Sequence, residues 1–311
     1  MIKYENFNEF YSNMNIENNK ILDDWKRIKM RKRKVSICIL TIIVLLDLLA
    51  VWIIHKISLF IIVEIFIIDI FVYIILQILF DNKQVSEFNI EYKEKVIEKL
   101  LENFIEELDY IPQKSMPNSI FDEVHYGGNY NKYYSDDYIE GKIKEQKIIM
   151  SDILVQREEK TIDPNGNEAI QIITIFDGLF AKINLKKSIN SSLNIIRDYG
   201  ITLHTNQKLE MDSSEFEKKF NVYSNNEIIG MQLLTPDVQE DILYLYNKYN
   251  INFNIYIFEN RMYVLFNTGS MFEIFSTKNN PIKMLERYFE IMKFIHNLVE
   301  KIIMTIEETQ I

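Results

Sequence analysis

Residues 35–80 constrain this chain more than any other segment, because they contain two long apolar runs separated by a short polar break. The first run, residues 35–54, has twenty residues and a single charged side chain, Asp47. At about 1.5 Å per residue, a helix of that length spans roughly 30 Å, the thickness of a bilayer core. The second run covers residues 57–80. The pattern predicts a transmembrane helical hairpin made of helices 35–54 and 57–80.

Basic residues before the first run predict the orientation of this hairpin. Residues 26–34 carry seven Lys and Arg side chains, and basic residues that flank a membrane helix stay in the cytoplasm. The second helix should return through a short outer loop at residues 55–58. Both termini and all of residues 81–311 are then expected in the cytoplasm. The basic stretch also suits the binding of anionic lipid headgroups, an alternative that stays open.

Three carboxylates, Asp47, Glu64 and Asp69, lie inside the expected membrane helices. Asp47 and Glu64 are each eight residues from the polar break at His55 and Lys56, so a tight hairpin places them at equal depth. A charged acid at mid-bilayer costs about 2.5–3.5 kcal/mol, which favours a protonated, hydrogen-bonded pair. Three interpretations stay open: contacts between helices, a proton or cation site in an oligomer, and acids that are tolerated without a function.

Charge and composition exclude several classes of site. The formal net charge is −10, and residues 81–311 alone carry −12, which excludes nucleic-acid binding through phosphate neutralisation. The single cysteine, Cys38, allows no internal disulfide. The four histidines are far apart in sequence, so no pair has metal-ligand spacing. The sequence therefore predicts no metal site and no cofactor.

The remaining residues predict an α+β organisation around the hairpin. Residues 1–34 are expected to form a cytoplasmic helical segment with a polybasic end. Residues 81–112 are expected to contain a juxtamembrane amphipathic helix, clearest over 87–110 and ended by Pro112. Residues 113–311 predict a cytoplasmic domain in which helices pack on an antiparallel sheet.

Strands are expected mainly in the sheet-rich residues 138–211. Residues 138–162 alternate enough for two strands, and the turn signal DPNGNE at 163–168 leads into a β-rich stretch, 169–186. Its run IQIITIF is β-branched and apolar, as in a buried strand. Residues 252–269 alternate on both sides of Glu259–Asn260, which predicts a hairpin.

Helices are expected at three places in the second half of the chain. Residues 213–220 predict a short capped helix, followed by extended chain over 221–234. Thr235 and Pro236 are typical of the cap and first residue of a helix, which is expected over 235–249. The C-terminal helix, residues 281–308, has an apolar stripe broad enough to cover a sheet, with a coiled-coil seam as the alternative.

The motifs of nucleotide-binding loops, serine hydrolases and zinc proteases do not occur in the sequence. The most distinctive segment is HYGGNYNKYYSDD at 125–137. One interpretation is a ligand-binding loop with His125, Asp136, Asp137 and Glu140 as polar groups. The other is a surface loop that leads into the sheet. The DPNGNE turn differs from a calcium loop in its glycine position and in lacking the final glutamate.

Residues 216–245 resemble the core motif of the bacterial family called domain of unknown function 3137. The positions that match are Phe216, Phe220, Val222, Tyr223, Ser224, Leu234, Thr235 and Pro236. Further blocks follow the family order at 92–112, 135–142, 176–180, 261–266 and 271–275. The resemblance spans residues 88–300 and the two membrane helices before them, and Asn225–Glu227 departs from it.

The resemblance implies a domain anchored in the bacterial cell membrane and no assigned activity, and its core motif, residues 213–275, has structural explanations. A non-enzymatic, membrane-tethered binding or scaffold module is therefore the favoured hypothesis. Its expected partners are the lipid bilayer and a protein partner or a second copy of the chain; a basic partner suits the acidic domain. The alternatives are an enzyme or small-molecule sensor that uses residues 125–140, and an oligomeric ion- or proton-linked membrane component.

Overall fold

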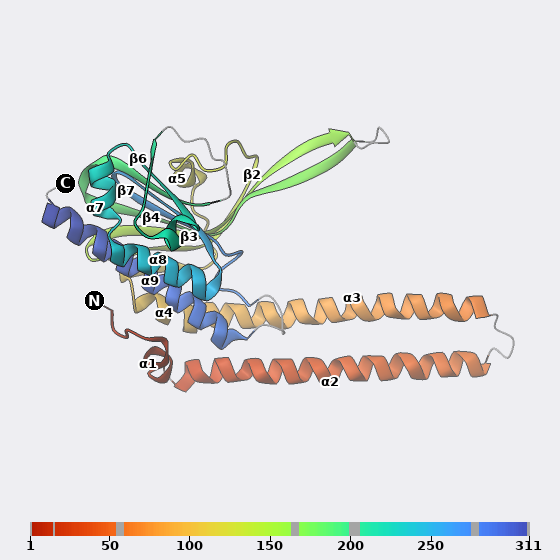
Figure 1. Cartoon of the computed structure of the whole chain (residues 1–311). Helices are drawn as coiled ribbons and strands as arrows, with labels where there is room; N and C mark the ends of the chain where they lie inside the picture. Colours follow the sequence, from red (N-terminus) through yellow and green to blue (C-terminus); the bar gives the residue numbers. More distant parts are fainter. Residues whose placement is uncertain are drawn as a thin grey trace. The chain divides into compact units, whose positions relative to one another are not determined.

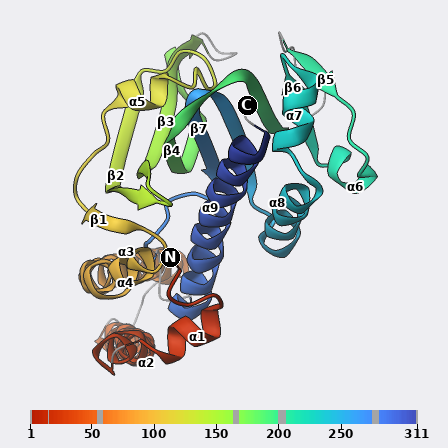
Figure 2. The same cartoon turned by 90° about the vertical axis from the view of Figure 1, so that its left-hand side faces the viewer.

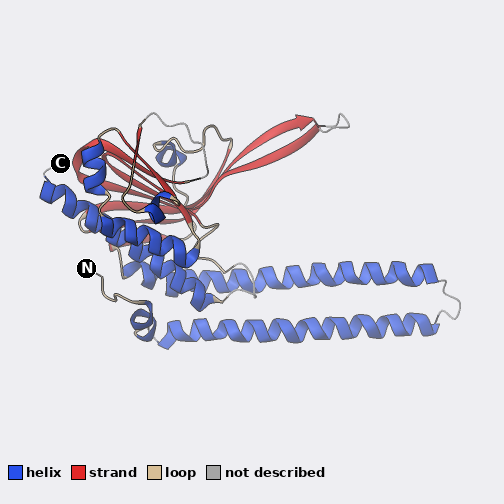
Figure 3. Cartoon of the chain, in the orientation of Figure 1, coloured by secondary structure: helices blue, strands red, loops and turns tan. Residues whose placement is uncertain are grey.

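The computed structural model describes residues 2–14, 16–53, 59–162, 168–198, 206–274 and 280–309. It confirms the expected α+β class, with helices packed on an antiparallel sheet (Figure 3). The chain divides into two compact units. The sheet unit comprises Met1–Glu9, Glu98–Phe272 and Glu286–Ile311, and the helical unit comprises Phe10–Ile97 and Glu273–Leu285.

Two long helices, α2 (Ile16–Ile53) and α3 (Leu59–Tyr92), lie side by side in the helical unit (Figure 1). The basic segment and the first apolar run thus form one helix, without a break at residue 34. The rings of Trp25 and Phe88 are 4.4 Å apart and both are buried. The hydroxyls of Ser36 and Tyr73 share a hydrogen bond of 2.5 Å. Among the described residues, no helix has both the length and the apolarity of a bilayer span.

The amphipathic helix expected over 87–110 is shorter than predicted. After α3 the chain continues through a π-helical turn at Lys93–Ile97 and α4 (Glu98–Glu102). Glu106–Ile111 then forms strand β1, which pairs with β2 (Lys132–Ile143). The helical prediction for these residues is wrong because backbone pairing at the edge of a sheet outweighs a helical apolar pattern.

Seven strands of the described chain form one antiparallel sheet in the order β1-β2-β3-β4-β6-β5, and β7 also pairs with β4. The longest are β3 (Gln146–Ile162), β4 (Glu168–Arg197) and β7 (Asn252–Asn267). The short strands are β5 (Gln207–Leu209) and β6 (Phe220–Ser224). The expected turn at 163–167 and the start of the expected strand at 201–205 lie outside the described residues.

The hairpin expected at 252–269 is wrong, because β7 is one strand. It pairs with β4 over most of its length, from Ile255 opposite Ile195 to Phe266 opposite Leu179. Glu259, at the predicted turn, has φ of 55° and lies where the register shifts. A bulge therefore absorbs the irregularity without reversing the chain.

Helices cover one face of the sheet, and α9 (Pro281–Thr309) runs across it (Figure 2). The ring of Phe294 in α9 contacts those of Phe253 and Phe266 in β7, at 5.3 and 6.0 Å. The broad stripe of α9 thus covers a sheet, as predicted. The helix expected at 235–249 is confirmed as α8 (Pro236–Tyr249), where the Thr235 hydroxyl accepts a hydrogen bond from the N–H of Val238.

The segment of the family motif before α8 contains a strand and two short helices. In α6 (Ser214–Glu217) and β6, the side chains of Phe216, Phe220 and Val222 are buried. Residues 227–233, expected to be extended, form helix α7 (Glu227–Leu233). The side chain of Asn226 caps this helix by accepting a hydrogen bond from the N–H of Ile229, which explains the helical start. Tyr223 and Leu234 are also buried.

Candidate functional site

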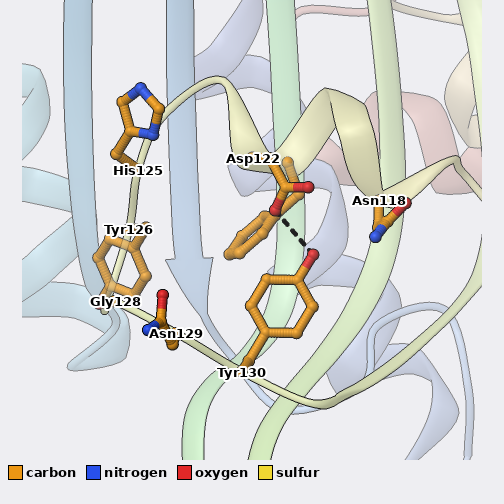
Figure 4. A pocket seen from close by; sticks show the side chains of 8 residues that line it. Asn118, Asp122, His125, Tyr126, Gly128, Asn129 and Tyr130 are labelled. Carbon is orange, nitrogen blue, oxygen red and sulfur yellow. Dashed lines mark hydrogen bonds between the residues drawn. The ribbon is translucent and has the colours of Figure 1, made fainter.

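The clearest candidate site is a hollow of about 500 Å³ formed by α5 (Asn118–Asp122) and the loop that follows it (Figure 4). We call it the loop hollow. A volume of this size lies within the range of about 300–1,000 Å³ that is typical of small-molecule sites. Its lining residues are Asn118, Phe121, Asp122, His125, Tyr126, Gly128, Asn129 and Tyr130.

Phe121 fixes the floor of the loop hollow. Its ring is buried and lies 5.5 Å from that of Phe180 and 5.7 Å from that of Phe176, both on β4. Above it, the hydroxyl of Tyr130 donates a hydrogen bond of 2.7 Å to the carboxylate of Asp122 (Figure 4). Burial, followed by this bond, raises the pKa of Tyr130. The loop hollow is therefore stabilised by aromatic packing at its floor and by the hydrogen bond between Tyr130 and Asp122 above the floor.

The loop backbone has positive φ at three positions, and two of them are glycines. His125, Gly127 and Gly128 all have positive φ, of 51°, 73° and 77°. A Cβ on Gly127 would lie 2.2 Å from a methyl carbon of Ile175, whereas nothing lies within 4 Å of one on Gly128. Gly127 therefore lets the loop approach β4 more closely than any other residue would.

The segment that contains α5 and the loop is tied to the sheet on both sides. Asn131 binds the backbone of Glu158 in β3 through two hydrogen bonds. The Asn131 side-chain amide donates to the carbonyl oxygen of Glu158 at 2.9 Å, and the Asn131 side-chain oxygen accepts from the backbone N–H of Glu158 at 2.8 Å. Before α5, the Ser115 hydroxyl donates to the carbonyl oxygen of Ser135 in β2 at 2.6 Å. These bonds hold the hollow in a preformed shape.

Glu123 fastens the end of α5 to two strands. It accepts from the ammonium of Lys182 at 2.7 Å, the hydroxyl of Tyr263 at 2.6 Å and the guanidinium of Arg261 at 3.4 Å. Burial works against the charged form, but these donors outweigh it and lower the pKa of Glu123. The sequence analysis missed this residue, because its partners are 59 to 140 positions away.

A second hollow, of about 630 Å³, lies on the other side of residues 124–127, and we call it the sheet hollow. His125 and Tyr126 line both hollows. The walls come from three strands and include Arg157, Ile173, Ser192, Asn194, Asn254 and Tyr256. The Asn254 side chain accepts a hydrogen bond from the N–H of Arg197 at 3.0 Å, which fixes its orientation. The two hollows together present amide, hydroxyl, imidazole and guanidinium groups over an aromatic and aliphatic base.

Of the residues predicted for a ligand loop, only His125 lines these hollows. Asp136 and Asp137 lie in β2; Asp137 is fully buried and accepts a 2.6 Å hydrogen bond from the hydroxyl of Tyr110. Glu140 forms an ion pair with Lys147 at 2.6 Å and accepts from the hydroxyl of Tyr138. The structure therefore separates His125 from the three acids.

Asp152 is a buried acid that sequence reasoning missed. It lies opposite Asp136 in the β2–β3 pair and is 3% exposed. One carboxylate oxygen accepts from the Ser270 hydroxyl at 2.7 Å and from the N–H of Met271 at 2.5 Å. Burial is the main cause that raises the pKa of Asp152 to about 8; the charges of Asp136 and Asp137 contribute in the same direction, and the hydrogen bonds from Ser270 and Met271 oppose it. The only sequence signal was an acid within the apolar run KIIMSDILV.

For the three acids of the expected membrane helices, the structure describes the side chain of Asp69 but not those of Asp47 and Glu64. Asp47 lies in α2 and Glu64 in α3, but their side chains are outside the described residues. Their predicted pairing stays a prediction. Asp69 lies in α3 with a half-buried side chain.

One comparison with known families agrees with the resemblance seen in the sequence. Residues 174–303 match the model of a family described as "Protein of unknown function (DUF3137)". The upstream blocks at 92–112 and 135–142 lie outside the match. No curated protein matches the sequence. A crystal structure of the mycobacterial trehalose monomycolate transport factor A is similar with a TM-score of 0.34 and 11% identity, over 62% of this chain and 88% of that one.

The described side chains of the two hollows can form hydrogen bonds with a ligand. Within the described residues, the hydrogen bond of His125 is made by its backbone N–H, which donates to the carbonyl oxygen of Asp122 at 3.1 Å. Nucleophilic catalysis needs a base hydrogen-bonded to a hydroxyl or thiol. In the loop hollow the Tyr130 hydroxyl is hydrogen-bonded to the Asp122 carboxylate, so the described lining combines donors and acceptors for a ligand with one pair of this kind.

Gly127→Ala is expected to displace the loop, and Gly128→Ala is the matched control. Both variants meet the same penalty for positive φ, of about 1 kcal/mol, but only Gly127→Ala also collides with Ile175. Hydrogen exchange of residues 118–131 should therefore accelerate more in Gly127→Ala than in Gly128→Ala. Equal exchange in the two variants would contradict the close approach.

Asp152→Asn should flatten the pH dependence of stability. Because the folded state holds the proton of Asp152 more tightly than the unfolded chain does, the free energy of unfolding should fall as pH rises from about 4 to 8. Asparagine keeps the acceptor for Ser270 and Met271 but does not titrate. Urea unfolding measured between pH 5 and 8 should show a smaller slope in the variant. Asp212→Asn, at an exposed position, is the control, and an unchanged slope in Asp152→Asn would refute the assignment.

Proposed function

We propose that this chain, whose residues 174–303 belong to the DUF3137 family, is a non-enzymatic binding module tethered to the bacterial cell membrane by a helical hairpin. The sheet unit and both termini lie in the cytoplasm in this proposal. The observation that carries the binding role is the pair of preformed hollows on either side of residues 124–127.

Exposed apolar side chains on the helical unit support the membrane tether. On the described turns of α2 they include Ile37, Leu40, Leu45 and Leu46, which are 53–61% exposed. On α3 they include Ile67, Ile68 and Phe71, which are 60–65% exposed. Apolar patches of this kind on a protein surface mark contacts with lipid or with another protein. The seven basic residues at 26–34 favour the cytoplasmic side for the N-terminus.

A small polar molecule is the ligand that the hollows fit best. The loop hollow offers the amides of Asn118 and Asn129, the Asp122 carboxylate and the His125 imidazole. Sites with a few polar groups over an aromatic floor bind small molecules by orienting their hydrogen-bonding groups. The loop hollow, which residues 125–130 help to line, therefore also supports the alternative of a small-molecule sensor that uses residues 125–140. A basic protein partner remains the proposal for the acidic surface of the sheet unit.

Ligand retention tests the binding role. The purified full chain would be equilibrated with a protein-free metabolite extract of bacterial cells, and retained compounds would be identified by mass spectrometry. A compound retained by the wild type should be lost in the double variant His125→Ala, Asn129→Ala, whereas Lys187→Ala, far along β4, should keep it. If no compound is retained, or if all three proteins retain it equally, the proposal fails.

Cysteine labelling tests the tether separately. On a Cys38→Ala background, the variant Ser58→Cys should react with a membrane-impermeant maleimide in protoplasts, whose cell membrane is intact and accessible from outside. A cysteine at Lys187 should react only after lysis. Ser58 belongs to the expected outer loop and lies outside the described residues. Labelling of both positions only after lysis would contradict the hairpin topology, and it would leave the ligand test unaffected.

A further inference from the structure

The outer parts of β3 and β4 form a ribbon that extends beyond the rest of the sheet (Figure 1). Its strands pair from Gln156 opposite Thr174 to Ile162 opposite Glu168. The pairing of β2 with β3 ends at Gln156, and that of β7 with β4 ends at Leu179. Two-stranded ribbons are at best marginally stable in water without a third strand or other cover.

The run IQIITIF, expected to be buried, lies mostly in this ribbon. Ile170 is 63% exposed and Ile172 is 55% exposed, and because they are two residues apart they lie on the same face. The prediction of a buried strand is wrong for these residues. A β-branched apolar sequence indicates a strand, but it does not show whether other strands or helices cover that strand. Phe176 is the first residue of β4 that is buried.

The two edges of the ribbon differ in protection. Asn131 occupies the outer edge of β3 by bonding both backbone groups of Glu158, and that edge also carries Lys160. On β4, residues 168–174 contain no lysine or proline, the residues that most often protect an edge, and Glu168 is their one charged residue; the bulge of this stretch lies beyond them, at Ile175. Within the described residues, no backbone hydrogen bond joins the outer edge of 168–176 to another strand. This edge is a ready template for an added strand.

We propose that the outer edge of β4 pairs with the same edge of a second copy of this chain, antiparallel and about a twofold axis at Gln171. In that register Ile170 of each copy lies opposite Ile172 of the other, and Ala169 lies opposite Ile173. Such β-branched cross-strand pairs stabilise a sheet. The pairing extends the ribbon to four strands, which satisfies its free backbone groups.

Charge favours a second copy over a bilayer as the occupant. The only charged residue at the joint, Glu168, faces Thr174 of the other copy, so the two acidic chains meet without like charges opposite each other. Lys160 lies opposite Ile170 in its own copy, and Glu158 lies opposite Ile172 in the other copy. Because Ile170 and Ile172 pair across the joint, Lys160 and Glu158 belong to the same cross-strand row and bring opposite charges to it. Glu158, Glu159 and Glu168 would repel an anionic lipid surface. One strand pair buries less than the roughly 800 Å² per partner of stable complexes, so the dimer should form reversibly.

A charge-swap pair of variants tests the register. Ile170→Lys with Ile172→Lys places lysine opposite lysine, whereas Ile170→Lys with Ile172→Glu places lysine opposite glutamate. Sedimentation of the full chain in detergent should show a dimer of the second variant that is at least about tenfold tighter than that of the first, corresponding to about 1.4 kcal/mol. Equal dissociation constants for the two variants would overturn the proposal.

Disulfide cross-linking gives an independent readout at the twofold axis. On the Cys38→Ala background, Gln171→Cys should form a covalent dimer on mild oxidation, since position 171 faces itself. Glu159→Cys is the matched control, because it lies opposite Gln171 but one strand away from the joint. Equal cross-linking of the two variants, or none in Gln171→Cys, would refute the pairing. Circular dichroism of each variant would verify that the exposed substitutions leave the fold intact.

Discussion

The backbone ladder of β4 is the constraint on which the sheet unit depends. This strand of 30 residues pairs with β3 over its first part, with β7 from Leu179 onward and with β6 near its end. Buried N–H and C=O groups must be hydrogen-bonded, so a strand that crosses the whole unit has to find partners along each covered stretch. The position of β4 between β3 and β6 on one side and the single long β7 on the other is consistent with this requirement.

The candidate site is built on the same strand. Gly127 packs against Ile175 of β4, Phe121 rests on Phe176 and Phe180, and Glu123 is paired with Lys182. These contacts place α5 and its loop on the face opposite α9. β4 therefore has two covered faces over these residues, which explains why consecutive residues such as Leu179, Phe180 and Ala181 are all buried.

The sequence correctly predicted the helices α8 and α9, whose formation depends on neighbouring residues in the chain. Thr235 and Pro236 start α8 through their own hydroxyl and fixed φ, and the stripe of α9 describes a single face. The hairpin at 252–269 and the helix over 106–111 failed because distant strands decide them. Phe253 and Leu265 alternate equally well in a hairpin and in one bulged strand, and only pairing with β4 distinguishes the two.

The candidate site was predictable only in outline, for the same reason. The unusual glycine–aromatic composition pointed to His125, but no sequence spacing joins it to the wall residues of β4 and β7. Asp122 belongs to the site through Tyr130, eight positions later, and Asn254 through its position on the facing strand. Asp136 and Asp137 were predicted as ligands because acids are polar, yet Asp137 is fully buried in β2.

The ribbon joins the two proposed activities in one element. Because side chains alternate along a strand, Ile173 and Arg157 form an opposed pair on one face and line the sheet hollow, while Ile170 and Ile172 lie on the other face. A strand added at the edge of β4 would stiffen the backbone that carries both sets. Pairing between copies would therefore reduce the freedom of one wall of the sheet hollow, because Ile173 and Thr174 belong both to that wall and to the joint. A ligand that needs that wall fixed would bind the paired form more tightly, and by reciprocity it would favour pairing.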